Sequence, residues 1–291
     1  MGPKGTRLQK AARFGAALGA LGCTLGGGGA TTECVAEPAI HVATPGYDNA
    51  RHAVVADVLL DRIVFADGVE VGPSSFIYPA EIRGVEYGGP IRRLRTINGP
   101  LATVGPAGIA YIEFGDGEDE SVSSEDLLAF GDRMETSWAN PNLNNRVHLH
   151  AQTTYSFTVG LETEVWDSNF GADQRPELFI FEDQGNSVMT IQPLDEDLEP
   201  VGTPVEVRAT DIQSISPSKV WVGRFGMDGE PQSGTYELKM FAIDLSRLGV
   251  THMRWFRITN RISGGGEASA DLKIIAVDTS PAPAAQTMTF D

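Results

Sequence analysis

The chain has 291 residues, enough for one large domain or two ordinary ones. Its 39 acidic and 22 basic residues give a formal net charge of −17, which argues against nucleic acid or an anionic membrane as a partner, because phosphate groups attract the opposite sign. A hydrophobic fraction of 41% is ample for a folded core, and 33 glycines with 17 prolines are typical of a loop-rich β protein.

Residues 1–36 are predicted to be an export leader. Four basic residues precede an apolar run from Phe14 to Leu25, which is too short to span a bilayer and suits the apolar region of a signal peptide. Cleavage after Ala30 or after Ala36 fits this pattern. The alternative is a lipoprotein leader, because the segment ending at Cys23 resembles a lipobox, and lipidation of Cys23 would anchor the chain to a membrane. Either route predicts an extracytoplasmic protein, in the periplasm, at the cell surface or secreted.

The two cysteines, Cys23 and Cys34, both lie in this leader. Most ways of processing it leave no internal disulfide, so the fold is expected to depend on its apolar core. A zinc site built from several cysteines is excluded for the same reason.

Alternation of apolar and polar residues with a period of two dominates from about Ile40 onward. It is clearest over 153–165, where Tyr155, Phe157 and Val159 share one face with further apolar residues. The other expected strands, in chain order, are 53–65, 75–78, 91–97, 109–114, 146–151, 177–182, 188–193, 205–208, 219–224, 236–240, 253–259 and 271–276. A helix is expected over Ser123–Met134, and a short turn over Leu245–Leu248.

Many short strands separated by turn residues predict an all-β fold, an antiparallel β-sandwich of jelly-roll type. The expected division is a leader (1–36), an N-terminal β region (37–115), an acidic loop (116–124), a β-sandwich domain (125–278) and a tail (279–291). The N-terminal region either supplies further strands to the sandwich or forms a smaller β unit of its own.

Four segments of the C-terminal half resemble, in order, elements of exosortase-dependent surface proteins of the PEP-CTERM type. They are Asn142–Asn145, Asp173–Ser187, Ile243–Thr251 and Asp271–Val277. The resemblance implies an extracytoplasmic, non-enzymatic bacterial β-sandwich of surface or matrix type. The last residues, Thr287–Asp291, depart from that family's sorting tail, which carries a Pro-Glu-Pro motif, a membrane helix and a basic cluster, so the resemblance does not extend to processing by exosortase.

Acidic loops are candidate calcium sites, because Ca²⁺ takes carboxylate and carbonyl oxygens from loops. The candidate ligands are Asp116 and Glu118 in one loop and Asp167, Asn169 and Asp173 in another. A third acidic loop lies at 195–197. None of them has the EF-hand spacing, and the alternative interpretation is a set of solvated turns that keep the protein soluble.

Aromatic side chains are candidate platforms for sugar rings. Trp138 lies among polar loop residues and Trp166 lies beside the Asp167 loop, so these two are the expected carbohydrate-binding pair. Trp221 and Trp255 lie within strands and are expected in the core. His148 and His150 share one strand face but lack an evident third ligand for zinc.

No catalytic motif is present, so the chain is not expected to be an enzyme. The sequence favours an adhesive or structural surface protein whose partner is a polysaccharide or another surface protein. The alternative is a calcium-dependent carbohydrate-binding module. A third hypothesis is a secreted glycoside-active enzyme using a strand carboxylate with a raised pKa, such as Glu162, Glu164, Glu177 or Glu182.

Overall fold

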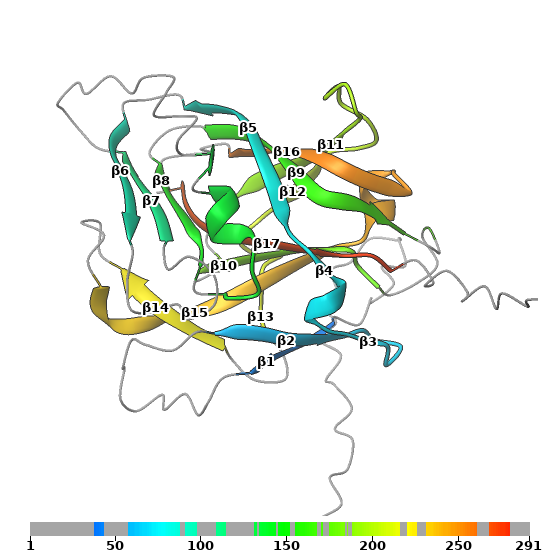
Figure 1. Ribbon diagram of the computed structural model, residues 1–291, viewed down its shortest axis with the longest axis horizontal. Helices are drawn as coiled ribbons and strands as arrows, with labels where there is room; N and C mark the ends of the chain where they lie inside the picture. Colours follow the sequence, from blue (N-terminus) through cyan, green and yellow to red (C-terminus); the bar gives the residue numbers. More distant parts are fainter. Residues whose placement is uncertain are drawn as a thin grey trace, which may run out of the picture. The chain divides into compact units, whose positions relative to one another are not determined.

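Strands dominate the computed structural model, as the alternation predicted (Figure 1). All residues that the structure describes belong to the unit Glu37–Asp291. They are 38–43, 58–87, 91–97, 109–114, 131–132, 134–143, 145–151, 155–167, 170, 175–183, 185, 188–215, 220–225, 231–260 and 268–279. No helix among them is long and apolar enough to cross a membrane.

Within these described ranges the strands form three sheets. The nine-stranded sheet contains β4 (Phe76–Ile77), β6 (Ile91–Ile97), β7 (Ile109–Phe114), β8 (Val147–Ala151), β10 (Leu178–Asp183), β13 (Gln213–Ser214), β14 (Val220–Phe225), β15 (Pro231–Ile243) and β17 (Ala268–Val277). The five-stranded sheet contains β5 (Pro79–Tyr87), β9 (Tyr155–Trp166), β11 (Met189–Leu194), β12 (Val205–Val207) and β16 (His252–Asn260). The three-stranded sheet contains β1 (Ala39–Ala43), β2 (Leu59–Val64) and β3 (Glu70–Val71). Two 3-10 helices, η1 (Pro73–Ser75) and η2 (Leu245–Leu248), complete these elements.

Strand order shows how distant segments come together. The main sheet runs β13-β15-β10-β17-β8-β7-β6, with β14 on β15 and β4 on β17, and the five-stranded sheet runs β12-β11-β16-β9-β5. Neighbouring strands are antiparallel except β7 and β8, which are parallel. The predicted all-β antiparallel sandwich is therefore confirmed, while its jelly-roll connectivity stays a prediction. The N-terminal β region contributes strands to all three sheets.

Two apolar clusters lie on opposite faces of the nine-stranded sheet. The first core joins this sheet to the five-stranded sheet, and β10 gives it Leu178 and Ile180. The second core joins it to the three-stranded sheet, and β10 gives it Phe179 and Phe181. Successive strand residues point to opposite faces, and both faces of the middle sheet are covered. Its strands therefore need apolar residues at consecutive positions, without the alternation of buried and exposed residues seen in a sheet with one solvent-facing side.

The buried lysine of β17 is a consequence of this middle position. Lys273 alternates with core residues and would be expected to face water, yet its side chain is fully buried. Its Nζ donates to the carbonyl oxygens of Ser137 (3.0 Å) and Trp138 (2.9 Å). Burial lowers the pKa of Lys273 well below its ordinary value. The side chain therefore closes the end of the helical turn that carries those two carbonyls.

The helix predicted over Ser123–Met134 lies mostly outside the described residues. The structure has helical residues at 131–132 and 134–138, so helix extends past the predicted end at Met134. Met134 and Trp138 pack in the first core and Leu143 in the second, so this segment passes from one core to the other beside β17. The predicted short turn at Leu245–Leu248 is η2.

Candidate functional site

Trp138 is buried and cannot serve as a sugar platform. Its exposed fraction is 0%, its ring packs against Phe157, and its indole nitrogen donates to the Leu272 carbonyl at 2.7 Å. The expectation that this residue is exposed is wrong, because its burial depends on long-range packing beside β17, which the neighbouring residues in the sequence do not reveal. Trp255 is buried as expected, although it lies on the outer face of its sheet and outside the apolar core. The side chain of Trp221 lies outside the described residues.

Trp166 has the exposure that carbohydrate binding requires. It ends β9, its exposed fraction is 44%, and its ring stacks on His252 with centroids 4.5 Å apart. Trp166 and His252 are cross-strand partners, and the next pair, Val165 and Met253, points into the first core. Since strand residues alternate between faces, the aromatic pair lies on the outer face of the five-stranded sheet. Glu164 contacts this aromatic pair through its carboxylate, which lies 3.5 Å from His252 Nε2.

Three carboxylates meet directly beside Trp166. Asp167, Glu177 and Asp244 each offer an oxygen within 4.8 Å of the other two. They come from the end of β9, the start of β10 and the end of β15, so strand pairing brings together residues far apart in the sequence. Asp167 and Glu177 are buried, at 6% and 0% exposed, and Asp244 is half-buried.

Hydrogen bonds hold this carboxylate cluster in place. Glu177 Oε2 accepts from the Leu245 backbone N–H at 3.0 Å, and Oε1 accepts from the Thr279 hydroxyl at 2.6 Å. That hydroxyl also lies 3.3 Å from the Trp166 carbonyl oxygen. Asp244 Oδ1 accepts from Ser246 N–H at 2.8 Å and so caps η2. The cluster therefore ties the exposed tryptophan to the ends of three strands.

Burial raises the pKa of Glu177 to about 8. The neighbouring charges of Asp244 and Asp167 also raise it, whereas the hydrogen bonds from Thr279 and Leu245 lower it. At neutral pH the cluster either keeps a proton on Glu177 or requires a cation to compensate its charge. Carboxylate oxygens in this arrangement suit a hard cation such as Ca²⁺, which would take further oxygens from backbone carbonyls.

The predicted calcium ligands are only partly within the described residues. Asp167 belongs to the cluster, but Asn169, Asp173, Asp116 and Glu118 lie outside the described residues, as does the lipidation candidate Cys23. In the third acidic loop, Asp195 Oδ1 accepts from the N–H groups of Asp197 and Glu199, both at 2.9 Å, so this carboxylate closes its own turn. Sequence reasoning named Glu177 only as a strand carboxylate and did not single out Asp244, because their proximity depends on strand pairing.

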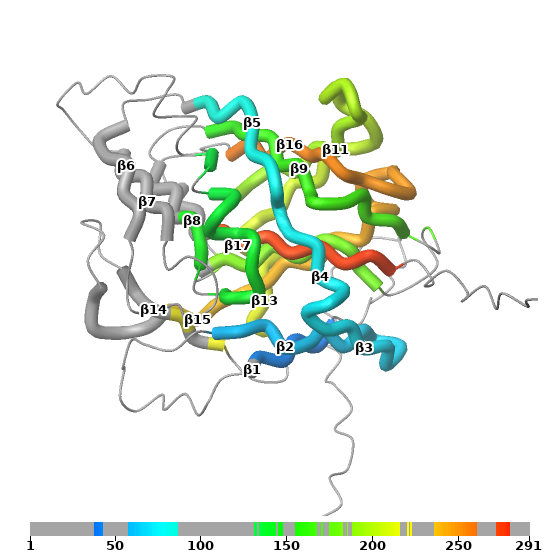
Figure 2. Tube along the Cα trace, viewed as in Figure 1, coloured from blue at the N-terminus to red at the C-terminus, as the bar shows by residue number. Residues whose placement is uncertain are grey.

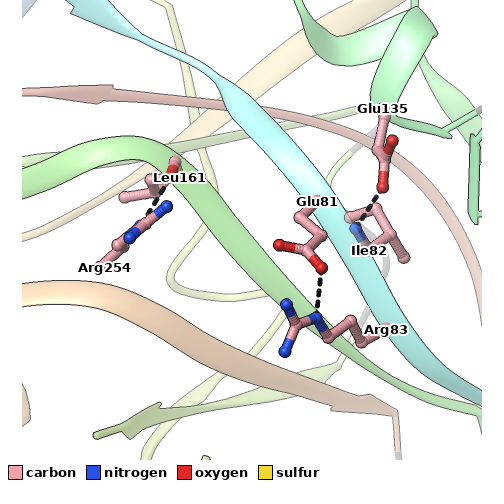
Figure 3. Close-up of polar contacts among 6 residues, drawn as sticks. All are labelled: Glu81, Ile82, Arg83, Glu135, Leu161 and Arg254. Atoms are coloured by element: carbon pink, nitrogen blue, oxygen red, sulfur yellow. Dashed lines mark hydrogen bonds and ion pairs between the residues drawn. The ribbon is translucent and has the colours of Figure 1, made fainter. Parts of the chain in front are cut away.

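Trp255 marks a second feature of the same outer face. Its indole lies over Gly160, where an added Cβ would be 2.3 Å from Trp255 Cζ3. The guanidinium groups of Arg83 and Arg254 lie 4.6 Å and 5.6 Å from the ring. Arg254 Nε donates to the Leu161 carbonyl at 3.4 Å, and Arg83 is hydrogen-bonded to Glu81 (Figure 3).

The fold and this surface define an all-β antiparallel sandwich with an aromatic and arginine-bearing outer face. Comparison of the chain with protein-family models, curated proteins and solved structures gives no match.

Proposed function

We propose that this protein is a non-enzymatic, exported β-sandwich of the bacterial cell surface or extracellular matrix that adheres to polysaccharide. The observation that carries the proposal is the exposed side chain of Trp166, whose ring is oriented by stacking on the ring of His252. Stacking on His252 orients the indole, and its exposed part is available for contact with the apolar side of a sugar ring. A pre-ordered aromatic ring loses little conformational entropy when the ligand binds.

A glycan-binding profile of the full chain tests this proposal. Trp166→Ala should lower retention on the polysaccharide that the wild type binds by about tenfold, since aromatic contacts are among the strongest in interfaces. Val69→Ala is the matched control, because Val69 is another exposed apolar side chain, in the loop between β2 and β3. Equal retention by wild type and Trp166→Ala, or no retention on any polysaccharide, contradicts the proposal.

Calcium dependence is the second candidate, favoured by the carboxylate cluster of Asp167, Glu177 and Asp244. A cation there would neutralise the cluster and fix the backbone of Trp166. Calcium should then raise the melting temperature of the wild type, and Asp167→Asn with Asp244→Asn should abolish the increase. Asp197→Asn, an exposed carboxylate of the 195–197 turn, is the control. Identical melting in calcium and in chelator would reject this candidate.

The glycoside-active hypothesis has weaker support. Glu177 has the raised pKa that it requires, but the side chain is fully buried and hydrogen-bonded to Thr279 and Leu245, which favours a structural role.

Export and anchoring rest on the leader sequence. Cys23→Ser should release the protein from the membrane fraction if the leader is lipidated, whereas a wild type already in the soluble fraction would favour a cleaved signal peptide.

A further inference from the structure

Strand register arranges the outer face of the five-stranded sheet into rows. One row contains Leu194, Trp255, Gly160 and Glu81, and the next contains Gln192, Arg257, Thr158 and Arg83. The residues that alternate with them, including Ile82, Val159 and Phe256, belong to the first core. The two rows therefore point away from the core, on the face that carries Trp166 and His252.

Arginines gather around Trp255 on this face, although the chain as a whole carries a net charge of −17. Arg83 and Arg254 lie against the indole, and Arg257 is two residues from it on β16. Arg83 is paired with Glu81. Among the described residues, neither Arg254 nor Arg257 forms an ion pair with a carboxylate, so their guanidinium groups keep donors for a ligand.

The distance from the arginines around Trp255 to Trp166 suits an extended ligand that contacts both. His252 and Trp255 are three residues apart on β16, which corresponds to about 10 Å of strand. Four features thus follow one another along β16: the Trp166–His252 pair, Arg254, the row of Trp255 and the row of Arg257. Ser156 and Thr259 add hydroxyl groups to the same face, and Gln192 adds its amide oxygen, since its Nε2 already donates to the carbonyls of Pro193 and Val201. Such groups bind sugar hydroxyls, and guanidinium groups match planar carboxylates.

We infer that this face binds an acidic polysaccharide, with uronate carboxylates held by Arg254 and Arg257 and a sugar ring stacked on Trp166. This inference rests on the proposed function and specifies its substrate class. A neutral polysaccharide would leave both guanidinium groups without an anionic partner. A nucleic acid requires many phosphate contacts, and two guanidinium groups that form no ion pair among the described residues supply few of them.

Affinity electrophoresis of the full chain in gels containing polygalacturonate or dextran tests the inference. A chelator is present throughout, so that calcium bound by the polymer cannot contribute, and about 0.15 M salt limits long-range repulsion to roughly 8 Å. The test variant is Arg254→Gln with Arg257→Gln. The control with the same charge change is Arg62→Gln with Arg208→Gln, two arginines on β2 and just after β12. Melting curves confirm that all variants are folded, and Arg257→Gln alone serves if the double variant is not.

Wild type should be retarded by polygalacturonate, and the test variant should bind it at least about tenfold more weakly while the control is unchanged. Equal weakening in the control, or retardation of the wild type by dextran alone, would overturn the inference. Retardation by neither polymer would overturn it too, and the glycan profile of wild type against Trp166→Ala would then decide the proposed function separately. Displacement of polygalacturonate by a lower concentration of single-stranded poly(dT) would point to nucleic acid and overturn it as well.

Discussion

Glu135 Oε1 accepts a hydrogen bond from the backbone N–H of Ile82 at 2.6 Å (Figure 3). Within the described residues β5 pairs only with β9, so its other edge presents backbone groups that could pair with another chain. Gly131 lies against the same strand, where an added Cβ would be 3.2 Å from the Ile82 carbonyl oxygen. The helical segment thus covers part of this sheet edge.

Glu135→Ala should lower the free energy of unfolding by about 1–2 kcal/mol, because the Ile82 N–H loses its acceptor. It should also increase self-association at high concentration, since the edge becomes available. Urea unfolding and sedimentation measure the two effects, and Glu196→Ala, in an exposed turn, is the control. A variant as stable and monomeric as this control would contradict the role assigned to Glu135.

Gly160→Ala should destabilise the protein by about 1–3 kcal/mol, because the new Cβ would displace the indole of Trp255. Tryptophan fluorescence should change with it. Gly72→Ala is the control, since its Cβ would meet nothing closer than the Asp61 carbonyl oxygen at 3.7 Å. Wild-type stability in Gly160→Ala would show that the indole does not lie on this backbone in solution.

Stability should fall as pH rises through the range in which Glu177 titrates. The pKa of Glu177 is about 8 in the folded protein and 4.5 ordinarily, so the folded state binds more protons between these values. Its contribution is fully present below 4.5 and is lost as pH rises through 8, by at most about 1.4 kcal/mol per pH unit. Denaturant unfolding should show that the free energy of unfolding of Glu177→Gln depends less on pH across this range than that of the wild type. Parallel profiles would mean that Glu177 is ionised throughout.

Lys273→Ala should cost about 2–5 kcal/mol, because it removes two hydrogen bonds to helical carbonyls and leaves a cavity. Lys273→Met keeps most of the volume and should cost less. Chemical unfolding compares both with Lys239→Ala, which alters a half-buried lysine on β15. Equal stability of Lys273→Ala and the control would show that the amine does not close the helical turn.

Sequence patterns predicted the strands well where one face is apolar and the other polar. β9 was expected over 153–165 and spans Tyr155–Trp166, and β6 and β7 have the predicted bounds. β5 was missed, because this edge strand buries little apolar surface and Pro79 and Gly84 interrupt its pattern. The packing of the three-stranded sheet on the middle sheet was not predicted either. Lys273 in β17 is buried, but in the sequence a lysine at this position indicates a face exposed to water.

The candidate site was predictable only where its parts are adjacent in sequence. Trp166 and Asp167 were identified together, but Glu177 and Asp244 join them through the pairing of β10 with β15 and β17. The Trp255 face could not be derived either, because cross-strand rows depend on register, and the register between β16 and β9 shifts between the pairs Met253–Val165 and Trp255–Gly160.

The position of β17 inside the nine-stranded sheet also determines the order in which the strands of this sheet can pair during folding. This strand, the last of those described and drawn in red in Figure 2, lies inside the nine-stranded sheet. It pairs with β10 on one side and with β8 and β4 on the other. A nascent chain therefore cannot complete the sheet until Val277 has left the ribosome. Until then the strands on the β10 side and those on the β8 side remain unjoined, so the middle layer and the two cores on its faces form only after most of the chain has been synthesised.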